Sequence, residues 1–420
     1  MEASSPLIEK ASAMVDEGRL WRRHMELAQI GATEKGGVNR QALSAEDARA
    51  RRLLVDWARD IGLDAFNDRI GNVFVRRSGT DGAAAPVLTG SHLDSQPTGG
   101  KFDGAYGVLA GVEALEAMNG AGVETRRAIC VVAWTNEEGS RFQPGCMGSA
   151  VFSGDANIDQ ILHVPDWDGT SVGQALERTL AATPDLPVTE PGFPVSAYIE
   201  AHIEQGPLLE ASGRTIGIVT GVQGARRYNV EVVGEEAHAG TAPLRARKDA
   251  LRAAVAMVAA LGEEMADDTD TVRFTVGRFD VSPGSPNTVP GRVRFTIDFR
   301  HPDASTIAEL CGRIEPTCRA HAQGCEVAVK PISDTPPTDF DPAIIDTVRR
   351  HAARLNLGHM DMFSSAGHDA IFLAGVCPAG MIFVPCERGI SHNEAENATP
   401  GDLAAGARVL TACLTELANS

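Results

Sequence analysis

The sequence has no long hydrophobic run, although hydrophobic residues make up 43% of the 420 residues. A helix that crosses a bilayer needs about 18 or more consecutive apolar residues, so we expect no membrane span. The first residues, Met1–Ser5, contain no basic patch followed by an apolar run. We therefore expect no secretion signal.

The sequence also lacks closely spaced cysteine pairs. None of its eight cysteines belongs to a Cys-x-x-Cys motif; they are Cys130, Cys146, Cys311, Cys318, Cys325, Cys377, Cys386 and Cys413. A thiolate zinc site or a disulfide framework is therefore not expected. A reduced, cytoplasmic environment fits this cysteine usage best.

Positive charge is scarce, because 38 lysines and arginines face 56 aspartates and glutamates, which gives a net charge of −18. Such a surface repels phosphate backbones and anionic lipids, so we predict no nucleic-acid or membrane partner. A chain of this length is too long for one ordinary hydrophobic core. We therefore expect at least two domains.

Helical and strand-like segments alternate in the first half of the chain. Residues 6–62 have helical periodicity, and short strands are predicted at 73–75 and 86–91. A helix is predicted from 103–104 onward, followed by a nearly continuous apolar run at 129–134. Such runs are typical of strands covered on both faces. The alternation predicts an α/β fold with a mostly parallel sheet.

The pattern changes near residue 222. Apolar residues alternate with polar ones from Tyr228, a helix is predicted over 251–261, and two more alternating strands are predicted at 272–276 and 293–299. These elements predict a small α+β unit with one solvent-exposed sheet face. The α/β pattern returns near 336. We therefore predict one domain from 1–221 and 336–420, with 222–335 inserted into it.

The densest group of polar residues runs from His92 to Gly104, at the end of a predicted buried strand. Strand ends are the usual place for sites in open α/β sheets. His92 can bind a metal, and Asp94 can accept a hydrogen bond from the other ring nitrogen. Asp103 can bridge two cations. The alternative is a polar turn with one structural histidine.

Three further segments carry candidate ligands or bases. Glu137 and Glu138 follow the apolar run directly; one could bind a metal while the other takes a proton from an attacking water. His202 lies between Glu200 and Glu204 in a predicted strand, and His392 lies in the segment 391–394. Taken alone, each segment fits an ordinary polar surface better than a metal site.

Taken together, the segments supply a mixed set of nitrogen and oxygen ligands for two divalent ions. The set is His92, Asp103, Glu138, His202 and His392. This joint pattern is far more specific than any of its parts. Zinc, manganese, cobalt and nickel all accept such ligands, so the residues do not select the metal.

These segments resemble those of the M20 metallopeptidase and amidohydrolase superfamily. The matching stretches are 90–94, 99–104, 135–139, 202–207 and 391–394, and the likeness covers essentially the whole chain. The sequence is most similar to the branch of N-carbamoyl-L-amino-acid hydrolases, β-ureidopropionases and allantoate amidohydrolases. The resemblance implies a metallopeptidase-like catalytic domain with a mostly parallel sheet. The inserted domain would be a ferredoxin-like lid and dimerisation domain.

The resemblance also implies catalytic and metal-binding roles. Asp103 would bridge two ions, and Glu137 would be the general base. His92 and ligands drawn from Glu138, His202 and His392 would complete the metal site.

Further residues are assigned to the substrate by the same resemblance. His238 would stabilise the developing oxyanion. Arg300, Asn287 and Gln205 would hold the carboxylate end of the substrate, and Gly367 would lie close to it. Without the resemblance, Arg300 would be interpreted as a member of a surface salt bridge. His238 would be a loop histidine with no known role.

The predicted activity is metal-dependent hydrolysis of an N-carbamoyl amino acid, which releases ammonia, carbon dioxide and the free amino acid. The predicted protein is a homodimer with two divalent ions per subunit and a small ureido acid as substrate. Allantoate hydrolysis and an aminoacylase or dipeptidase activity stay open, because a fold does not fix a substrate. A metal-binding scaffold without catalysis is a further alternative. It is disfavoured by Glu137, since metal binding alone needs no free carboxylate beside a ligand.

The sequence departs from the family pattern at three places. Ser95 follows the His-x-Asp triplet where threonine is common. Ser364-Ser365 stand before Gly367 where glycine or another small residue is expected. Thr241-Ala242-Pro243 replaces a commoner Thr-Thr-Pro or Ser-Thr-Pro. None of these departures removes a proposed ligand, but each can tune the choice of substrate.

Overall fold

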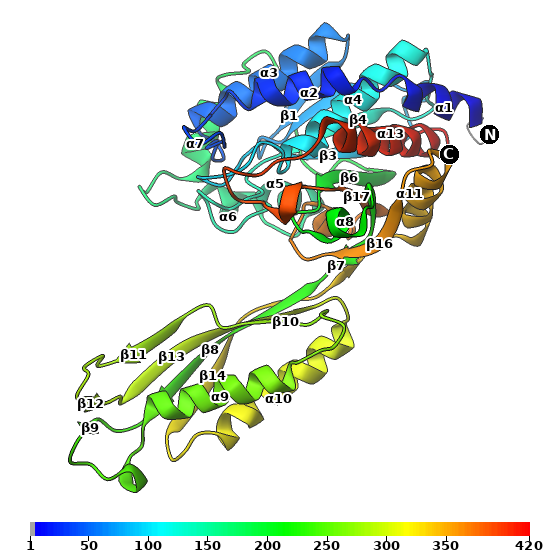
Figure 1. The fold of residues 1–420 in the computed structure, drawn as a ribbon. Helices are drawn as coiled ribbons and strands as arrows, with labels where there is room; N and C mark the ends of the chain where they lie inside the picture. Colours follow the sequence, from blue (N-terminus) through cyan, green and yellow to red (C-terminus); the bar gives the residue numbers. More distant parts are fainter. Residues whose placement is uncertain (1–4) are drawn as a thin grey trace. The chain divides into compact units, whose positions relative to one another are not determined.

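The computed structural model describes residues 5–420, so most of the segment that bears on a secretion signal lies outside the described residues. The chain divides into two compact units (Figure 1). Unit 1 comprises Met1–Thr220 and Asp339–Ser420, and unit 2 comprises Gly221–Thr338. No helix among the described residues is long and apolar enough to cross a bilayer.

Unit 1 is built on a 10-stranded sheet formed within the described residues, in the order β15-β7-β17-β6-β3-β4-β2-β1-β5, with β16 paired to β7. The strands are β1 (Asp64–Asp68), β2 (Val73–Arg77), β3 (Val87–His92), β4 (Ile129–Trp134), β5 (Val188–Thr189), β6 (Ala197–Ile203), β7 (Ile216–Val222), β15 (Thr338–Asp339), β16 (His359–Ser364) and β17 (Ala379–Val384).

The four central strands, β17, β6, β3 and β4, run parallel to one another. Every residue in these four strands is buried, as expected for a sheet that is covered on both faces. Strands β2 and β7 extend this centre in the antiparallel direction. The predicted α/β fold with a largely parallel central sheet is confirmed.

Helices cover both faces of this sheet. On one face, α4 (Ala105–Ala121) packs against β3 and β6, and α13 (Pro400–Leu417) packs against α4. The helix α4 is buried almost all round because α1 (Ser5–Ala13), α2 (Glu17–Leu27) and α13 lie over it (Figure 1). The remaining helices of unit 1 are α3 (Ala45–Asp60), α5 (Met147–Ser153), α6 (Ile158–Leu162), α7 (Val172–Leu180), α8 (Leu208–Ser212), α11 (Pro342–Arg354), α12 (Ala370–Leu373) and the 3-10 turn η2 (Glu387–Gly389).

The segment between α2 and α3 departs from the predicted helical stretch of residues 6–62. Residues 28–44 form turns and short bridges because tertiary contacts replace helical hydrogen bonds there. The N–H of Val38 donates to the carbonyl of Gly99 at 2.9 Å. The buried guanidinium of Arg40 donates to the carbonyl of Leu93 at 2.7 Å. Residues 28–44 therefore pack against the loop that follows β3 and stabilise it through these hydrogen bonds.

Unit 2 has the order β8–α9–β10–β11–β13–α10–β14 along the chain, and its five-stranded sheet is ordered β10-β13-β8-β14 with β11 also on β13. All of these pairings are antiparallel. The bounds are β8 (Gly224–Val233), α9 (Ala250–Glu264), β10 (Arg273–Thr275), β11 (Phe279–Ser282), β13 (Arg292–His301), α10 (Ala304–Ala320) and β14 (Glu326–Thr335). A separate pair joins β9 (Ala237–His238) to β12 (Thr288–Val289), and η1 spans Leu244–Ala246.

The sheet of unit 2 has one buried and one exposed face. Val293, Phe295, Ile297 and Phe299 alternate along β13 and pack against α9 and α10. The intervening residues of β13, which include Arg300, lie on the opposite and more polar face. The sequence predicts an α+β unit at residues 222–335, and the compact unit in the structure spans Gly221–Thr338.

Candidate functional site

The candidate site lies where the central strands of unit 1 end. β3 ends at His92, β4 is followed directly by Thr135–Glu138, and His202 is the penultimate residue of β6. Because these strands are parallel, their carboxyl ends meet at one edge of the sheet. The side chains that the sequence analysis selected from separate segments are thereby brought together.

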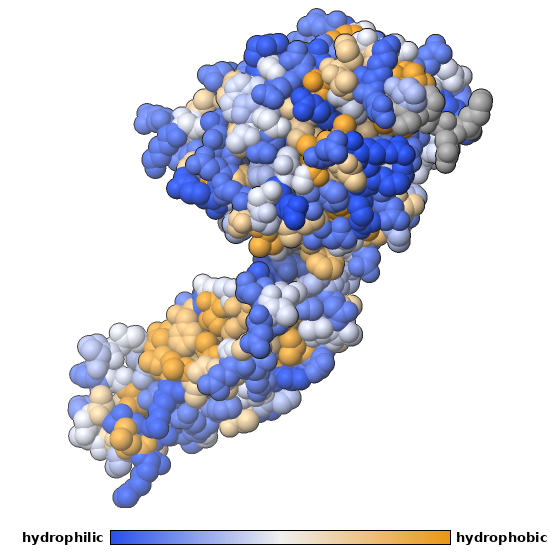
Figure 2. All heavy atoms as spheres, turned by 45° about the vertical axis from the view of Figure 1, so that its right-hand side comes forward, coloured by the Kyte–Doolittle hydropathy of each residue, from blue (hydrophilic) through white to orange (hydrophobic). Residues whose placement is uncertain are grey.

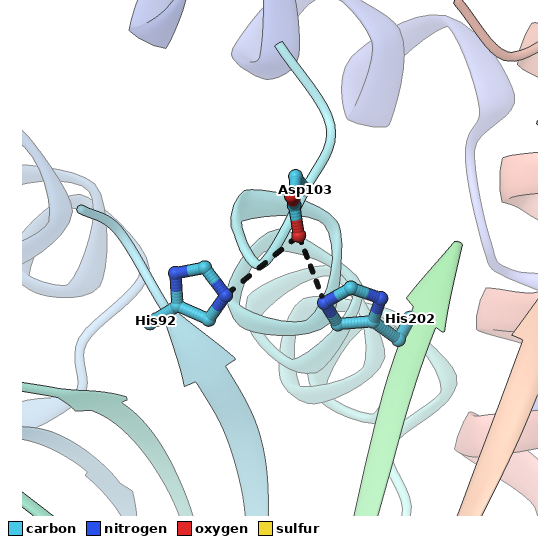
Figure 3. A group of neighbouring side chains, drawn as sticks. All are labelled: His92, Asp103 and His202. Carbon is cyan, nitrogen blue, oxygen red and sulfur yellow. Dashed lines mark ion pairs between the residues drawn. The ribbon is translucent and has the colours of Figure 1, made fainter. Parts of the chain in front are cut away.

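Asp103 occupies the centre of this group. It lies in the turn before α4, and its side chain is 5% exposed. One carboxylate oxygen, Oδ1, is 3.2 Å from Nε2 of His202 and 3.8 Å from Nε2 of His92. Figure 3 shows the two rings, one from each strand, turned toward this carboxylate.

The other oxygen of Asp103 faces a second pair of residues. Oδ2 is 3.2 Å from Nε2 of His392, and this same nitrogen is 3.4 Å from Oε2 of Glu138. The ligand atoms of His92, Asp103 and His202 all lie within 4.8 Å of one another, as do those of Asp103, Glu138 and His392. The two potential ligand groups therefore share Asp103, with one carboxylate oxygen directed to each.

Backbone contacts orient both buried histidines of the first group. Nδ1 of His92 is 2.9 Å from the carbonyl oxygen of Asp94, and Nδ1 of His202 is 2.8 Å from the carbonyl oxygen of Ile203. A carbonyl can only accept, so each Nδ1 carries the proton when the ring is neutral. In the neutral rings both Nε2 atoms carry the lone pair that a metal ligand needs, whereas the protonated ring of His202 donates from Nε2 to Asp103.

Asp94 supports the site differently from the prediction. The sequence predicts that its carboxylate accepts the hydrogen bond from Nδ1 of His92, but the backbone carbonyl of Asp94 does so. The carboxylate instead accepts the N–H groups of Glu137 at 3.3 Å and Glu138 at 3.2 Å. The reason is that the loop after β4 folds over the loop after β3. Asp94 thus fixes the backbone of the two adjacent glutamates.

The two glutamates point to different neighbours. Glu138 accepts hydrogen bonds from the backbone and side chain of Gln96 and faces His392. Oε2 of Glu137 is 3.4 Å from Nε2 of His92, and its Oε1 accepts a hydrogen bond from the thiol of Cys146 at 3.4 Å. Glu137 belongs to neither ligand group. It is a carboxylate beside the ligands rather than a member of either set.

Several buried acidic side chains lie close together in the site, and burial and neighbouring charges shift their pKa values. Burial, reinforced by the charges of Asp369 and Glu138, raises the pKa of Glu137 well above its ordinary value. Burial and the charge of Asp103 raise the pKa of Glu138 to about 8. Burial also opposes ionisation of Asp103, but hydrogen bonds from His202 and His392 outweigh it and lower the Asp103 pKa well below its ordinary value. The acids are therefore close enough to destabilise each other's charge.

The histidines respond to the same charges. Burial lowers the pKa of His92 to about 4. Burial also lowers the pKa of His202, but its contacts with Asp103 more than offset this and raise the pKa to about 9. The hydrogen bond with Asp103 raises the pKa of His392 to about 9.

The distances fit metal ions. Ligand atoms about 2.0–2.2 Å from a tetrahedral ion lie roughly 3.4 Å apart, which is close to the separations seen around Asp103. Among the described residues of unit 1, no lysine or arginine forms an ion pair with Asp103, Glu137 or Glu138. Divalent cations would supply the missing positive charge, and the nitrogen and carboxylate donors suit them.

Gly104 makes the close approach of His92 possible. Its φ is +65°, and a Cβ at this position would lie 2.3 Å from the ring of His92. A side chain here would therefore displace the imidazole from Asp103 and would also strain the backbone.

Other residues predicted for the substrate or left without a role surround the ligands. The side-chain amide of Gln205 donates to Oδ2 of Asp103 and to the hydroxyl of Ser391, both at 3.1 Å. Gly367 is exposed, with no atom within 4 Å of where its Cβ would be. His368 is buried, its Nε2 is 2.9 Å from the hydroxyl of Ser364, and its ring packs edge-on against His202 at 4.6 Å.

Three predicted substrate residues belong to unit 2. The exposed His238 accepts hydrogen bonds at Nδ1 from the N–H groups of Gly240 and Thr241, so its neutral ring carries a proton on Nε2. Asn287 precedes β12, whose Thr288 pairs with His238. Arg300 donates from Nε to Asp298 at 2.8 Å and from Nη2 to the same carboxylate at 3.3 Å.

The sequence patterns assigned no supporting role to several residues that hold the site together. Glu200 accepts hydrogen bonds from Ser91, Tyr198 and the N–H of Ala370. Asp369 accepts one from Ser149, and Glu396 accepts three from the segments that carry Asp103 and His392. The one signal was position, since Asp369 follows His368 and Glu396 lies four residues after His392. An acid near a candidate ligand does not by itself reveal what it contacts.

Comparison with known proteins agrees with this geometry. Residues 88–416 match the family described as Peptidase family M20/M25/M40. The chain belongs to this family. It is similar to an N-carbamoyl-L-amino-acid amidohydrolase of Rhizobium meliloti, with 41% identity over 408 residues that cover 96% of this chain and 97% of the relative. An allantoate amidohydrolase of Escherichia coli (strain K12) is 34% identical, covering 93% of this chain and 96% of the relative.

Solved structures give the same result. The crystal structure of an amidase of the hydantoinase/carbamoylase family from Burkholderia multivorans has a TM-score of 0.92 and 47% identity, covering 97% of this chain and 98% of that one. The predicted membership of the M20 family is confirmed, and with it a hydrolase of a metal-dependent family.

Proposed function

We propose that unit 1 binds two divalent ions through the residues around Asp103. His92, His202 and Oδ1 of Asp103 would hold one ion, and Glu138, His392 and Oδ2 of Asp103 would hold the other. The observation that carries this proposal is the division of the Asp103 contacts between its two oxygens. A carboxylate that bridges two ions uses one oxygen for each.

We further propose that the substrate is an N-carbamoyl amino acid, hydrolysed to ammonia, carbon dioxide and the free amino acid. Three relatives that are 36–41% identical over at least 93% of this chain are named N-carbamoyl-L-amino-acid amidohydrolases. Allantoate is the second candidate, because a relative with 34% identity acts on it by name and it is also a ureido acid.

Glu137 is the general base of this proposal. Two divalent ions would lower the pKa of water and polarise the ureido carbonyl. Glu137 would take the proton of the attacking water and pass it to the leaving nitrogen. Its place beside the ligands and its hydrogen bond from Cys146 support this role. The burial that raises its pKa also makes it a better proton acceptor than an exposed glutamate.

Residues of both units are proposed to bind the substrate. His238 would donate from Nε2 to the developing oxyanion, an assignment supported by the two backbone hydrogen bonds that its Nδ1 accepts. Asn287, Arg300 and Gln205 would hold the carboxylate of the substrate, and Gly367 would leave room for it. The hydrogen bond to Asp298 would fix the orientation of the Arg300 guanidinium.

The proposed activity is tested by measuring ammonia release from ureido acids and amino-acid release from N-acetyl amino acids and dipeptides. We expect chelator-stripped protein to be inactive and a divalent ion to restore hydrolysis of N-carbamoyl-L-amino acids, with a higher kcat/KM than for allantoate, N-acetyl amino acids or dipeptides. A higher kcat/KM for allantoate would favour the second candidate. Full turnover by protein shown by elemental analysis to hold no metal would refute the metal-dependent mechanism.

The roles of base and ligand are separated by metal content. Glu137→Gln is expected to keep wild-type metal content and to lose about a hundred- to ten-thousand-fold in turnover, because an amide cannot accept the proton. Asp103→Ala should lose both ions, whereas His392→Ala should retain one. Elemental analysis after dialysis measures all three. Loss of metal from Glu137→Gln would show that Glu137 is a ligand.

The role of Arg300 is tested by substitution at two positions of β13. Arg300→Lys keeps the charge but loses the planar fork, so kcat/KM for ureido acids should fall by roughly ten- to hundred-fold, with a larger fall for Arg300→Ala. Substrates whose carboxylate is replaced by a neutral amide should be nearly indifferent to either change. Arg294→Lys is the matched control, because Arg294 lies on the same face and pairs with Glu231. Equal losses for the acid and the amide would show that Arg300 supports the structure instead.

We also propose that the protein is a homodimer assembled through unit 2. Figure 2 shows apolar side chains gathered on part of the surface of unit 2. Its exposed large apolar residues include Val255, Phe279 and Ile332. In the described residues, β14 pairs only with β8, so its other edge can accept another strand.

Light scattering at micromolar concentration measures this directly. We expect a mass of twice the 44.3 kDa of one chain. A fully active monomer at that concentration would contradict the assembly.

A further inference from the structure

Glu396 is a buried acid to which neither the sequence motifs nor the proposed reaction assigns a role. It lies in the loop between η2 and α13, four residues after His392, and is only 1% exposed. Glutamates are almost never this buried unless they are paired. Among the described residues, no lysine or arginine forms an ion pair with it, so its hydrogen bonds must account for its place.

All of these hydrogen bonds reach segments that carry proposed metal ligands. Oε1 accepts the backbone N–H of Phe102 at 2.9 Å and that of Asp103 at 3.1 Å. Oε2 accepts the hydroxyl of Ser391, the residue before His392, at 3.0 Å. One carboxylate therefore ties together two segments that lie nearly 300 residues apart in the sequence.

The surrounding chain makes room for this carboxylate. A Cβ on Gly100 would lie 2.0 Å from both Cδ and Oε1 of Glu396, so glycine is the residue that leaves the position open. The glycine-rich turn before Asp103 thus receives the side chain of Glu396.

These hydrogen bonds matter because few other contacts position His392. Its side chain is 51% exposed, and its backbone has a φ of +52°, which is uncommon for a residue other than glycine. Buried strands position His92 and His202, but a loop positions His392. The hydrogen bonds of Glu396 link this loop to the turn that carries Asp103.

We propose that Glu396 is a positioning residue that sets the separation between Asp103 and His392 and thereby the affinity of the site for divalent ions. This inference rests on the proposed metal function. Glu396 touches neither the ions nor the substrate in this account. It acts through the backbone N–H groups of Phe102 and Asp103 and through Ser391.

The test compares Glu396→Ala with Glu396→Gln, using zinc or cobalt as the probe. Alanine removes both acceptors, and affinity should fall by about 10- to 100-fold, as is usual when a group that orients a ligand is lost. Glutamine keeps an oxygen for the two N–H groups, and its NH₂ can donate to Ser391, which can in turn donate to Asp103. Its affinity should therefore stay within a few-fold of wild type. Glu387→Ala, an exposed acid in the neighbouring turn, is the matched control and should bind like wild type.

Metal affinity is measured by chelator competition, and thermal unfolding of each metal-free variant is measured beside it. The proposal predicts that Glu396→Ala loses affinity while its metal-free form remains folded, and that glutamine rescues the affinity. Wild-type affinity in Glu396→Ala would overturn the proposal. So would an affinity loss in Glu396→Gln as large as that in the alanine variant. If wild-type protein itself binds neither ion, the metal function fails, and that outcome is distinct from a failure of Glu396 alone.

Discussion

The site depends on the repulsion between carboxylates held in one small, buried space. The side chains of Asp103, Glu137 and Glu138 are 5%, 12% and 4% exposed; the charge of Asp103 raises the pKa of both glutamates, and the charge of Glu138 also raises that of Glu137. Burying uncompensated charge is expensive, and a protein normally avoids it by pairing or by binding a cation. His202 and His392 supply part of the counter-charge to Asp103, and the divalent ions proposed above would supply the rest. The crowding of these acids thus favours the proposed binding of divalent ions.

The fold supplies the rigidity that this arrangement needs. Parallel strands bring His92 and His202 to the same edge of the sheet, and backbone carbonyls fix both rings with Nε2 toward Asp103. The loops are then held to one another, by Asp94 on the side of the glutamates and by Glu396 on the side of His392. Carboxylates thus serve in two ways here, since some face the proposed ions and others accept backbone N–H groups behind them.

In unit 2, the two faces of strand β13 differ in their contacts. Alternate residues of β13 fill the core under α9 and α10, while the residues between them form ion pairs on the opposite face. Arg300 belongs to this second set and is already bound to the carboxylate of Asp298. Asp298 accepts hydrogen bonds from Nε and Nη2 of Arg300 and also from Arg227.

The sequence by itself determined the α/β class, the family and the candidate ligands, because apolar runs and polar strand ends are local patterns. His92, Glu137 and His202 follow or end such runs and could be selected without a structure. The turn structure of 28–44, the carbonyl contact of Asp94 with His92 and the burial of Glu396 were decided only by tertiary structure. Each depends on segments far apart in the chain: Val38 meets Gly99, the Glu137 loop covers Asp94, and Glu396 reaches Asp103. Local periodicity carries no information about such pairs, since hydrogen bonds between distant segments form only when packing brings them within reach.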